Sequence, residues 1–261
     1  MEFINYWKDT LAPDDRDYTC EMLFGYAEEL PSYVLLSNNE IQNQRYEDPY
    51  GCVFYSSSDT SNTMNFFEKS WIKITGHELC QKAIEKWVLD PNAGAYWEDW
   101  PKLLRELWYI SYYGRCRSLE DIKLSLHNKR PVVTGSNTID WNKSLQNNFT
   151  AVYGPNYGHF FTIMWYDDSK QRLICENSYW KDEWDNGYFY INYSDYSLLY
   201  NSKFTMNDTL NPNVIRDAIT IEDAKLFFDR WYTSWTNPTA PITRQECFAL
   251  LERVLRVNNL K

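Results

Sequence analysis

The most constraining feature of the sequence is a pair of apolar runs between His159 and Asn177. The first run begins at His159 and is followed by Asp167 and Asp168, and the second ends just before Asn177. Runs rich in β-branched and aromatic residues on either side of an Asp-Asp turn indicate two paired strands. Because such a hairpin brings its two open ends together, we expect His159 to lie close to Asn177.

The composition is that of a globular chain with an unusual number of aromatic residues. The 261 residues are 44% hydrophobic and 24% charged, which suffices for one two-lobed unit with a substantial core. A formal net charge of −10 without a long basic run argues against nucleic-acid binding. Aromatic residues make up 18% of the chain, which suggests wide contacts between lobes, a partner surface, or both.

The sequence contains no signal for export, membrane insertion or metal binding. The N-terminus lacks the basic and apolar regions of a signal peptide, and no run approaches a membrane span, so we expect a cytoplasmic or virion-associated protein. Only three histidines occur, none with ligand spacing to a cysteine, so neither a metal nor another cofactor is expected. The six scattered cysteines are expected to be reduced: Cys20, Cys52, Cys80, Cys116, Cys175 and Cys247.

The distribution of patterns divides the chain into three parts. Residues 1–28 form a polar, aromatic lead-in, residues 29–205 a central domain, and residues 206–261 a C-terminal helical appendix. Within the central domain, the region of about 45–117 is mostly helical in pattern, and about 118–205 is rich in strands and turns. Helices followed by strands predict an α+β fold with a cleft between two lobes.

Helix signals are clearest at three places in the central domain. Residues 78–89 carry an apolar face that includes Cys80, which we expect to be a buried small hydrophobic residue. A second helix is expected from Pro101 onward. Ser118 and Asp121 have the spacing of a capping box and predict the start of a third helix.

The C-terminal appendix has the pattern of a helix–loop–helix unit. Residues 220–223 and 243–246 have capping-box spacing, and each precedes an amphipathic run. The unit is expected to serve docking or attachment. Because it weakly resembles helical C-terminal modules of phage and bacterial surface-associated proteins, a phage-encoded, virion-borne setting is one expectation.

Three residue types could form a nucleophilic site. Cys52 follows a glycine-bearing loop and could open a helix, where the dipole and free N–H groups lower a thiol pKa. His159 could pair with this thiol, and Asn177 could fix the imidazole tautomer. Gln44, or alternatively Gln42, could donate to an oxyanion together with the Cys52 N–H. The remaining histidines are expected on helix surfaces: His77 and His127.

At these residues, positions 29–200 resemble the papain-like cysteine peptidase family. The resemblance lies in seven segments: Glu29–Leu36, Ile41-Gln42-Asn43-Gln44, Gly51-Cys52-Val53-Phe54-Tyr55-Ser56, Ser118–Val133, His159–Asp167, Glu176–Trp180 with Trp184 after it, and Gly187–Ile191. It implies a papain-like fold with a helical left lobe, a β-barrel-like right lobe, and a peptide or protein substrate. It also implies a thioester acyl-enzyme.

The resemblance assigns a role to each matching residue. Cys52 would be the nucleophile, His159 the general base and Asn177 the residue that orients the imidazole. Gln44 would be the oxyanion-hole donor. Two aromatic residues are candidates for shielding the His–Asn hydrogen bond from water: Tyr179 and Trp180.

Departures from the family pattern leave alternatives open. Val53 stands where an aromatic residue is usual, and the segment from Gln44 to Cys52 is longer than the common pattern. Shifting the alignment by one residue would place Val53 at the nucleophile position. A catalytically degenerate papain fold would then act as a structural or binding protein, assembling through its aromatic surface or C-terminal helices. An acyltransferase on the same fold would use the same residues.

Overall fold

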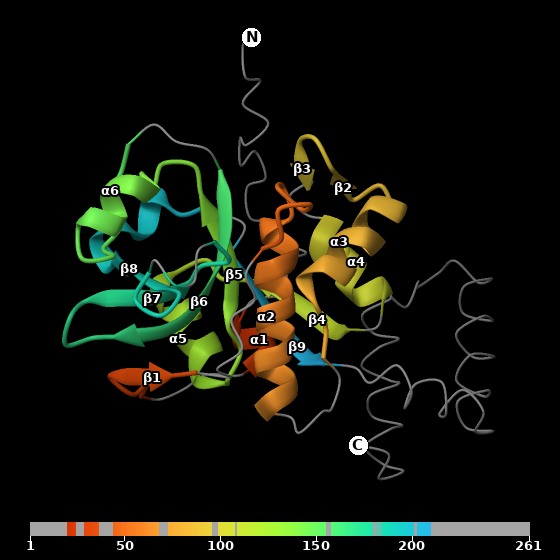
Figure 1. Ribbon diagram of the computed structural model, residues 1–261. Helices are drawn as coiled ribbons and strands as arrows, with labels where there is room; N and C mark the ends of the chain where they lie inside the picture. Colours follow the sequence, from red (N-terminus) through yellow and green to blue (C-terminus); the bar gives the residue numbers. More distant parts are fainter. Residues whose placement is uncertain are drawn as a thin grey trace, which may run out of the picture.

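The computed structural model describes residues 20–24, 29–36, 44–67, 73–95, 99–107, 109–154, 158–179, 182, 184–200 and 203–209 (Figure 1). Residue Trp180, the segment with Gln42 and nearly all of the predicted C-terminal appendix lie outside the described residues. No helix in these ranges is long and apolar enough to cross a membrane.

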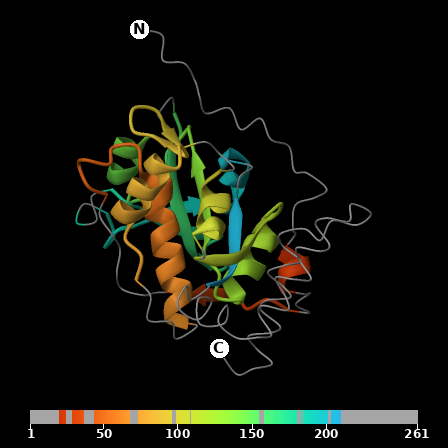
Figure 2. The same ribbon diagram turned by 90° about the vertical axis from the view of Figure 1, so that its right-hand side faces the viewer.

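Two helices, Gly76–Glu85 and Asp99–Glu106, lie on one side of the molecule, whereas most strands of the large sheet lie on the other side with the helices Leu119–His127 and Trp141–Gln146 (Figure 1). The longest helix among the described residues, α2, stands between these two sides, and Figure 2 shows it in front of the sheet. The helices are α1 (Cys20–Phe24), α2 (Cys52–Phe67), α3 (Gly76–Glu85), α4 (Asp99–Glu106), α5 (Leu119–His127), α6 (Trp141–Gln146) and the 3-10 helix η2 (Tyr193–Leu198).

An antiparallel sheet connects the two sides. Its strands follow the order β4-β9-β5-β6-β7-β8, and β1 also pairs with β6. The strands are β1 (Tyr33–Leu35), β4 (Ile110–Arg115), β5 (Val132–Ser136), β6 (His159–Asp167), β7 (Arg172–Glu176), β8 (Tyr188–Asn192) and β9 (Phe204–Thr209), and a separate two-stranded sheet joins β2 (Leu89–Asp90) to β3 (Gly94–Ala95).

Local signals in the sequence place several elements correctly. The predicted hairpin is confirmed by β6 and β7, which pair from Thr162 opposite Glu176. The capping box is confirmed as well, since the Ser118 hydroxyl accepts from the Asp121 N–H at 3.0 Å at the start of α5. Cys80 is fully buried on α3, as its apolar face predicts. The α+β class is therefore confirmed.

The expected barrel-like lobe needs correction. Among the described strands the sheet stays open, with β4 at one end of its path and β8 at the other. The strand β4 lies within the region that the sequence pattern assigns to helices, and β9 crosses the predicted domain boundary at residue 205. These two strands pair with each other from Ile110 opposite Thr209, and such a contact between distant segments leaves no local signal.

The strand β6 belongs to both halves of the core. Phe161 and Ile163 are buried in the cluster on the sheet side, whereas Phe160 packs into the helical cluster with residues of α2, α3 and α4. Successive side chains of a strand point to opposite faces, so a single strand can serve two cores. His159, the first residue of β6, therefore lies where the two halves meet.

Gly135 on β5 provides a test of this packing. A Cβ at Gly135 would lie 2.5 Å from the His159 carbonyl oxygen and 2.6 Å from the Tyr200 ring. We expect Gly135→Ala to lower the free energy of unfolding by about 1–3 kcal/mol, because neither neighbour can move freely. Urea denaturation measures this change.

The matched control is Gly154→Ala, whose Cβ would meet only Asp140 atoms at 3.7 Å, an ordinary contact. We expect this variant to change stability by less than about 1 kcal/mol. Equal effects of the two substitutions would contradict the close approach of β5 to β6.

Candidate active site

Cys52 is the first residue of α2, as predicted, and it follows Gly51 directly. A Cβ at Gly51 would lie 2.5 Å from the Cys80 sulfur, so the close packing of α3 explains the glycine at this position. The Cys52 side chain is buried, and its sulfur accepts a hydrogen bond of 3.5 Å from the Phe160 N–H. The thiol thus contacts the residue that follows His159.

His159 and Asn177 lie together at the open end of the β6–β7 hairpin. The imidazole Nε2 is 2.9 Å from the Asn177 Oδ1, which also accepts the Tyr179 N–H at 3.0 Å. Since a carbonyl oxygen can only accept, Nε2 must carry the hydrogen and donate it. The other ring nitrogen, Nδ1, is buried and has no hydrogen-bond partner among the described residues. The geometry thus leaves Nδ1 free to accept a proton.

Two aromatic rings enclose the imidazole. Tyr179 stacks on His159 with ring centroids 4.3 Å apart and an angle of 17° between the planes. Trp141, at the start of α6, contacts the same ring edge-on at 5.0 Å. Tyr179, one of the two candidates for a shielding residue, therefore covers one face of the imidazole. Trp141 has no local sequence signal, because only the fold brings α6 next to β6.

Gln44 is fixed at both ends of its amide. Its Nε2 donates to the Asp48 carbonyl, and its Oε1 accepts from the Ser178 hydroxyl at 3.3 Å. The Gln44 backbone N–H also donates to the Ser178 carbonyl at 2.8 Å. A primary amide has two N–H donors, and a side-chain hydrogen bond also joins Gln44 to Tyr179.

Burial controls the protonation of the two central groups. It raises the pKa of the Cys52 thiol to about 11, although the N–H groups of Phe160, Val53 and Cys52 act in the opposite direction. It lowers the pKa of His159 to about 4, against the effect of the Asn177 hydrogen bond. The expectation that the helix N-terminus lowers the pKa of the Cys52 thiol is therefore wrong, because removal from water changes this pKa more than the local N–H groups do. The resting pair is a neutral thiol and a neutral imidazole.

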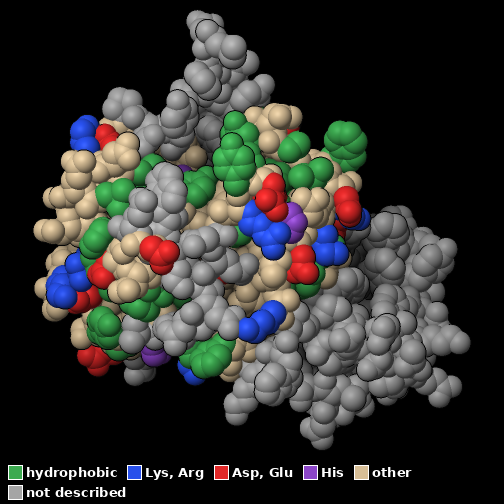
Figure 3. Space-filling view, in the orientation of Figure 1, with side chains coloured by type: hydrophobic (Ala, Val, Ile, Leu, Met, Phe, Trp, Pro, Cys, Tyr) green, Lys and Arg blue, Asp and Glu red, His purple; other side chains and the backbone are tan. Residues whose placement is uncertain are grey.

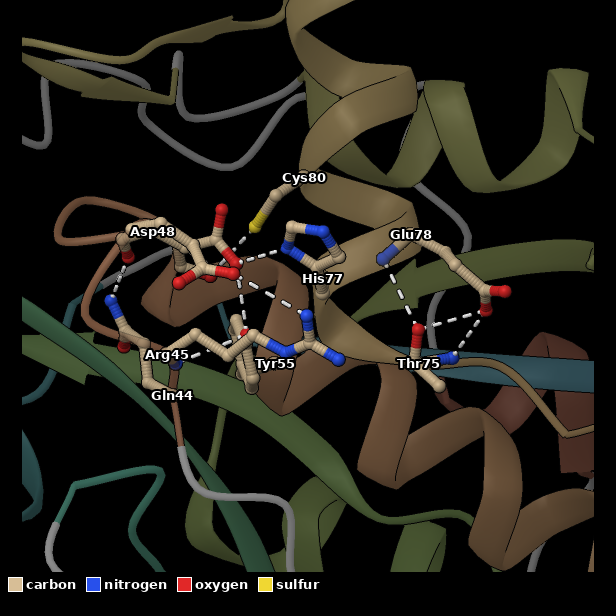
Figure 4. A network of polar contacts seen from close by, with 10 residues as sticks. Gln44, Arg45, Asp48, Tyr55, Thr75, His77, Glu78 and Cys80 are labelled. Atoms are coloured by element: carbon tan, nitrogen blue, oxygen red, sulfur yellow. Dashed lines mark hydrogen bonds and ion pairs between the residues drawn. The ribbon is translucent and has the colours of Figure 1, made fainter.

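A second polar cluster braces the loop before Cys52 (Figure 4). The Asp48 carboxylate accepts from the Tyr55 hydroxyl at 2.9 Å and lies 2.8 Å from His77 Nδ1. The sequence patterns place His77 on a helix surface, and its side chain on α3 is indeed partly exposed. They give no sign of its contact with Asp48, because the two residues are 29 positions apart.

The described residues form no group of three or more His, Cys, Asp or Glu side chains placed to hold a metal ion.

Several large hydrophobic side chains are exposed, and hydrophobic side chains gather near the upper edge of the face in Figure 3. The most exposed are Tyr46, Trp87 and Phe66. Part of the predicted aromatic excess thus reaches the surface.

Comparison with known proteins identifies the fold. No protein-family model matches the sequence, and no curated protein matches it. The structure is similar to xylellain, a cysteine protease from Xylella fastidiosa, with a TM-score of 0.60 and 16% identity over 75% of this chain and 93% of that chain. It is also similar to digestive procathepsin L 3 of Tenebrio molitor, with a TM-score of 0.53 and 12% identity over 74% of this chain and 75% of that chain. The chain has a papain-like fold.

The buried imidazole predicts a specific dependence of stability on pH. The pKa of His159 falls from 6.5 to about 4 on folding, so below pH 6.5 the unfolded chain binds a proton that the folded protein does not. The free energy of unfolding therefore decreases as the pH falls, and at pH 5 this residue alone accounts for a loss of about 2 kcal/mol relative to pH 7.

Urea denaturation of His159→Gln tests this. The variant should lose about 2 kcal/mol less stability than the wild type between pH 7 and pH 5. His127→Gln, on the exposed end of α5, should keep the wild-type dependence. If His159→Gln and the wild type show the same loss, His159 does not titrate as a buried neutral imidazole.

Proposed function

We propose that this protein is a cysteine peptidase in which Cys52, His159 and Asn177 form the catalytic triad. The observation that carries the proposal is the arrangement around His159. Its Nε2 is bound to Asn177 at 2.9 Å, its Nδ1 lacks a hydrogen-bond partner among the described residues, and the following N–H contacts the Cys52 sulfur. A base with a fixed tautomer beside a thiol is the arrangement that nucleophilic catalysis requires.

The neutral resting pair determines the first step of the proposed reaction. As the Cys52 sulfur attacks the carbonyl carbon of a peptide bond, its proton moves to Nδ1 of His159. The charge that develops on the carbonyl oxygen is stabilised by the Cys52 N–H and by the Gln44 side-chain amide, which releases its hydrogen bond to Tyr179. The Asn177 Oδ1 accepts the hydrogen bond from Nε2–H throughout and stabilises the imidazolium ring.

The second half of the reaction returns every group to its starting state. Breakage of the carbon–nitrogen bond passes the proton from His159 to the departing amine and leaves a thioester on Cys52. Water then attacks the thioester and gives one proton to His159. The new acid leaves, and the proton returns to the Cys52 sulfur. The substrate class is therefore a peptide or protein.

Specific observations also favour a second candidate function, a catalytically inactive binding protein. Cys52 and His159 are only 5% and 3% exposed, and Tyr179 lies stacked on the imidazole. A substrate must reach a site that is nearly closed in this state. An inactive protein could use the same fold and its exposed aromatic residues for assembly; the phage or virion setting stays a prediction from the sequence.

Hydrolysis of fluorescein-labelled casein tests the peptidase proposal. Cys52→Ala and His159→Ala should each lower the rate by about 10⁴-fold or more, because they remove the nucleophile and its base. Cys116→Ala, which removes a buried thiol paired with Cys20 at 3.4 Å, serves as the matched control and should keep the activity. Retention of the wild-type rate by Cys52→Ala would refute the triad.

Iodoacetamide labelling separates the two candidate functions. In a peptidase, Cys52 should react faster than the fully buried Cys80, and His159→Ala should slow its reaction. Equal labelling of Cys52 and Cys80, with no effect of His159→Ala, would favour the inactive binding protein. Transfer of the acyl group to an added amine in preference to water would identify an acyltransferase.

A further inference from the structure

The Asp48 carboxylate lies at the centre of a buried polar network that the proposed triad does not use (Figure 4). Its side chain is only 2% exposed, and it contacts the Tyr55 hydroxyl at 2.9 Å and His77 Nδ1 at 2.8 Å. Carboxylates are almost never this buried without charged or hydrogen-bonding neighbours. Both neighbours come from helices, Tyr55 from α2 and His77 from α3.

The backbone of Asp48 organises the loop that leads to Cys52. Its carbonyl accepts the Gly51 N–H at 3.0 Å and the side-chain amide of Gln44, and its own N–H donates to the Arg45 carbonyl at 3.0 Å. The Tyr55 hydroxyl, which donates to the Asp48 carboxylate, accepts the Arg45 N–H at 3.1 Å. Asp48 thus connects Gln44 to two helices at once.

The contact with α3 depends on its first residue. A Cβ at Gly76 would lie 2.5 Å from the Tyr55 ring, so glycine allows the start of α3 to pack against Tyr55 and brings His77 to Asp48. Removing the donor at His77 would leave a buried carboxylate with less compensation. The loop would then have to shift so that water could reach Asp48.

We propose that Asp48, held by His77 and Tyr55, is a positioning residue that fixes the loop so that the Gln44 amide points at the developing oxyanion. The proposal rests on the proposed peptidase function. The Gln44 amide donates to the backbone carbonyl of Asp48, and the carboxylate of the same residue is held by Tyr55 of α2 and His77 of α3. A shift of Asp48 therefore moves the oxyanion donor, while His159, on β6, stays in place.

A double-mutant cycle on kcat distinguishes positioning from a purely structural role. His77→Phe should lower kcat for a fluorogenic peptide by about tenfold, less than the loss of 10²–10³ typical of removing an oxyanion donor. In a Gln44→Ala background the same substitution should cost less than about twofold, because the group it positions is gone. His77→Asn, whose amide can donate to Asp48, should recover most of the activity.

Two further variants keep the test informative. Tyr55→Phe leaves the His77 ring in place and removes one donor to Asp48, so it should lower kcat in the same direction and show the same non-additivity. His127→Phe is the control: it makes the same His-to-Phe change at an exposed residue at the end of α5, and it should leave kcat unchanged.

Alkylation of Cys52 by iodoacetamide provides a readout without an oxyanion. Its rate in His77→Phe should stay within about twofold of the wild type, since the reaction creates no oxyanion for Gln44 to stabilise. The positioning role alone would be overturned by either of two results. One is that the free-energy costs of His77→Phe and Gln44→Ala add fully in the double variant. The other is that His77→Phe lowers the rate of Cys52 alkylation as much as it lowers kcat. A wild-type protein without peptide turnover would overturn both this role and the proposed function.

Discussion

The hydrogen bond between His159 and Asn177 is the interaction on which the rest of the candidate site depends. It requires that β6 and β7 pair in one register, with Thr162 opposite Glu176. A slip of one residue would turn every side chain of the strand to the other face. The buried ring of Phe161 on β6 opposes such a slip, because it packs against the partly buried ring of Trp141 on α6 at 6.2 Å.

The opposite wall of the site is an unusually polar helix that is nevertheless buried. Two hydroxyls of α2 are satisfied locally, since Ser57 donates to the Val53 carbonyl at 2.6 Å and Ser58 to the Tyr55 carbonyl at 2.8 Å, whereas those of Ser56 and Ser61 have no hydrogen-bond partner among the described residues. Thr162 of β6 donates to the Ser56 carbonyl at 3.0 Å. These bonds tie helix and sheet together beside Cys52, so small polar residues replace the apolar stripe that a buried helix usually carries.

The sequence predicted those parts of the site that depend on neighbouring residues. The hairpin, the capping box at Ser118 and the helix that starts at Cys52 all have local signals, and the structure contains each of them. Contacts between distant segments could not be predicted, among them the pairing of β4 with β9 and the approach of His77 to Asp48. The thiol pKa was misjudged for the same reason: helix position is local, whereas burial depends on the whole fold.

In the proposed mechanism, Cys52 carries the acyl group during turnover, with His159 as its base. Intact-protein mass spectrometry after acid quenching of a reaction with a peptide ester tests it most directly. The wild-type protein should gain a mass equal to that of the acyl group, located on the peptide that contains Cys52, and His159→Ala should gain none. An unmodified wild-type protein, or an acyl group on another cysteine, would contradict it.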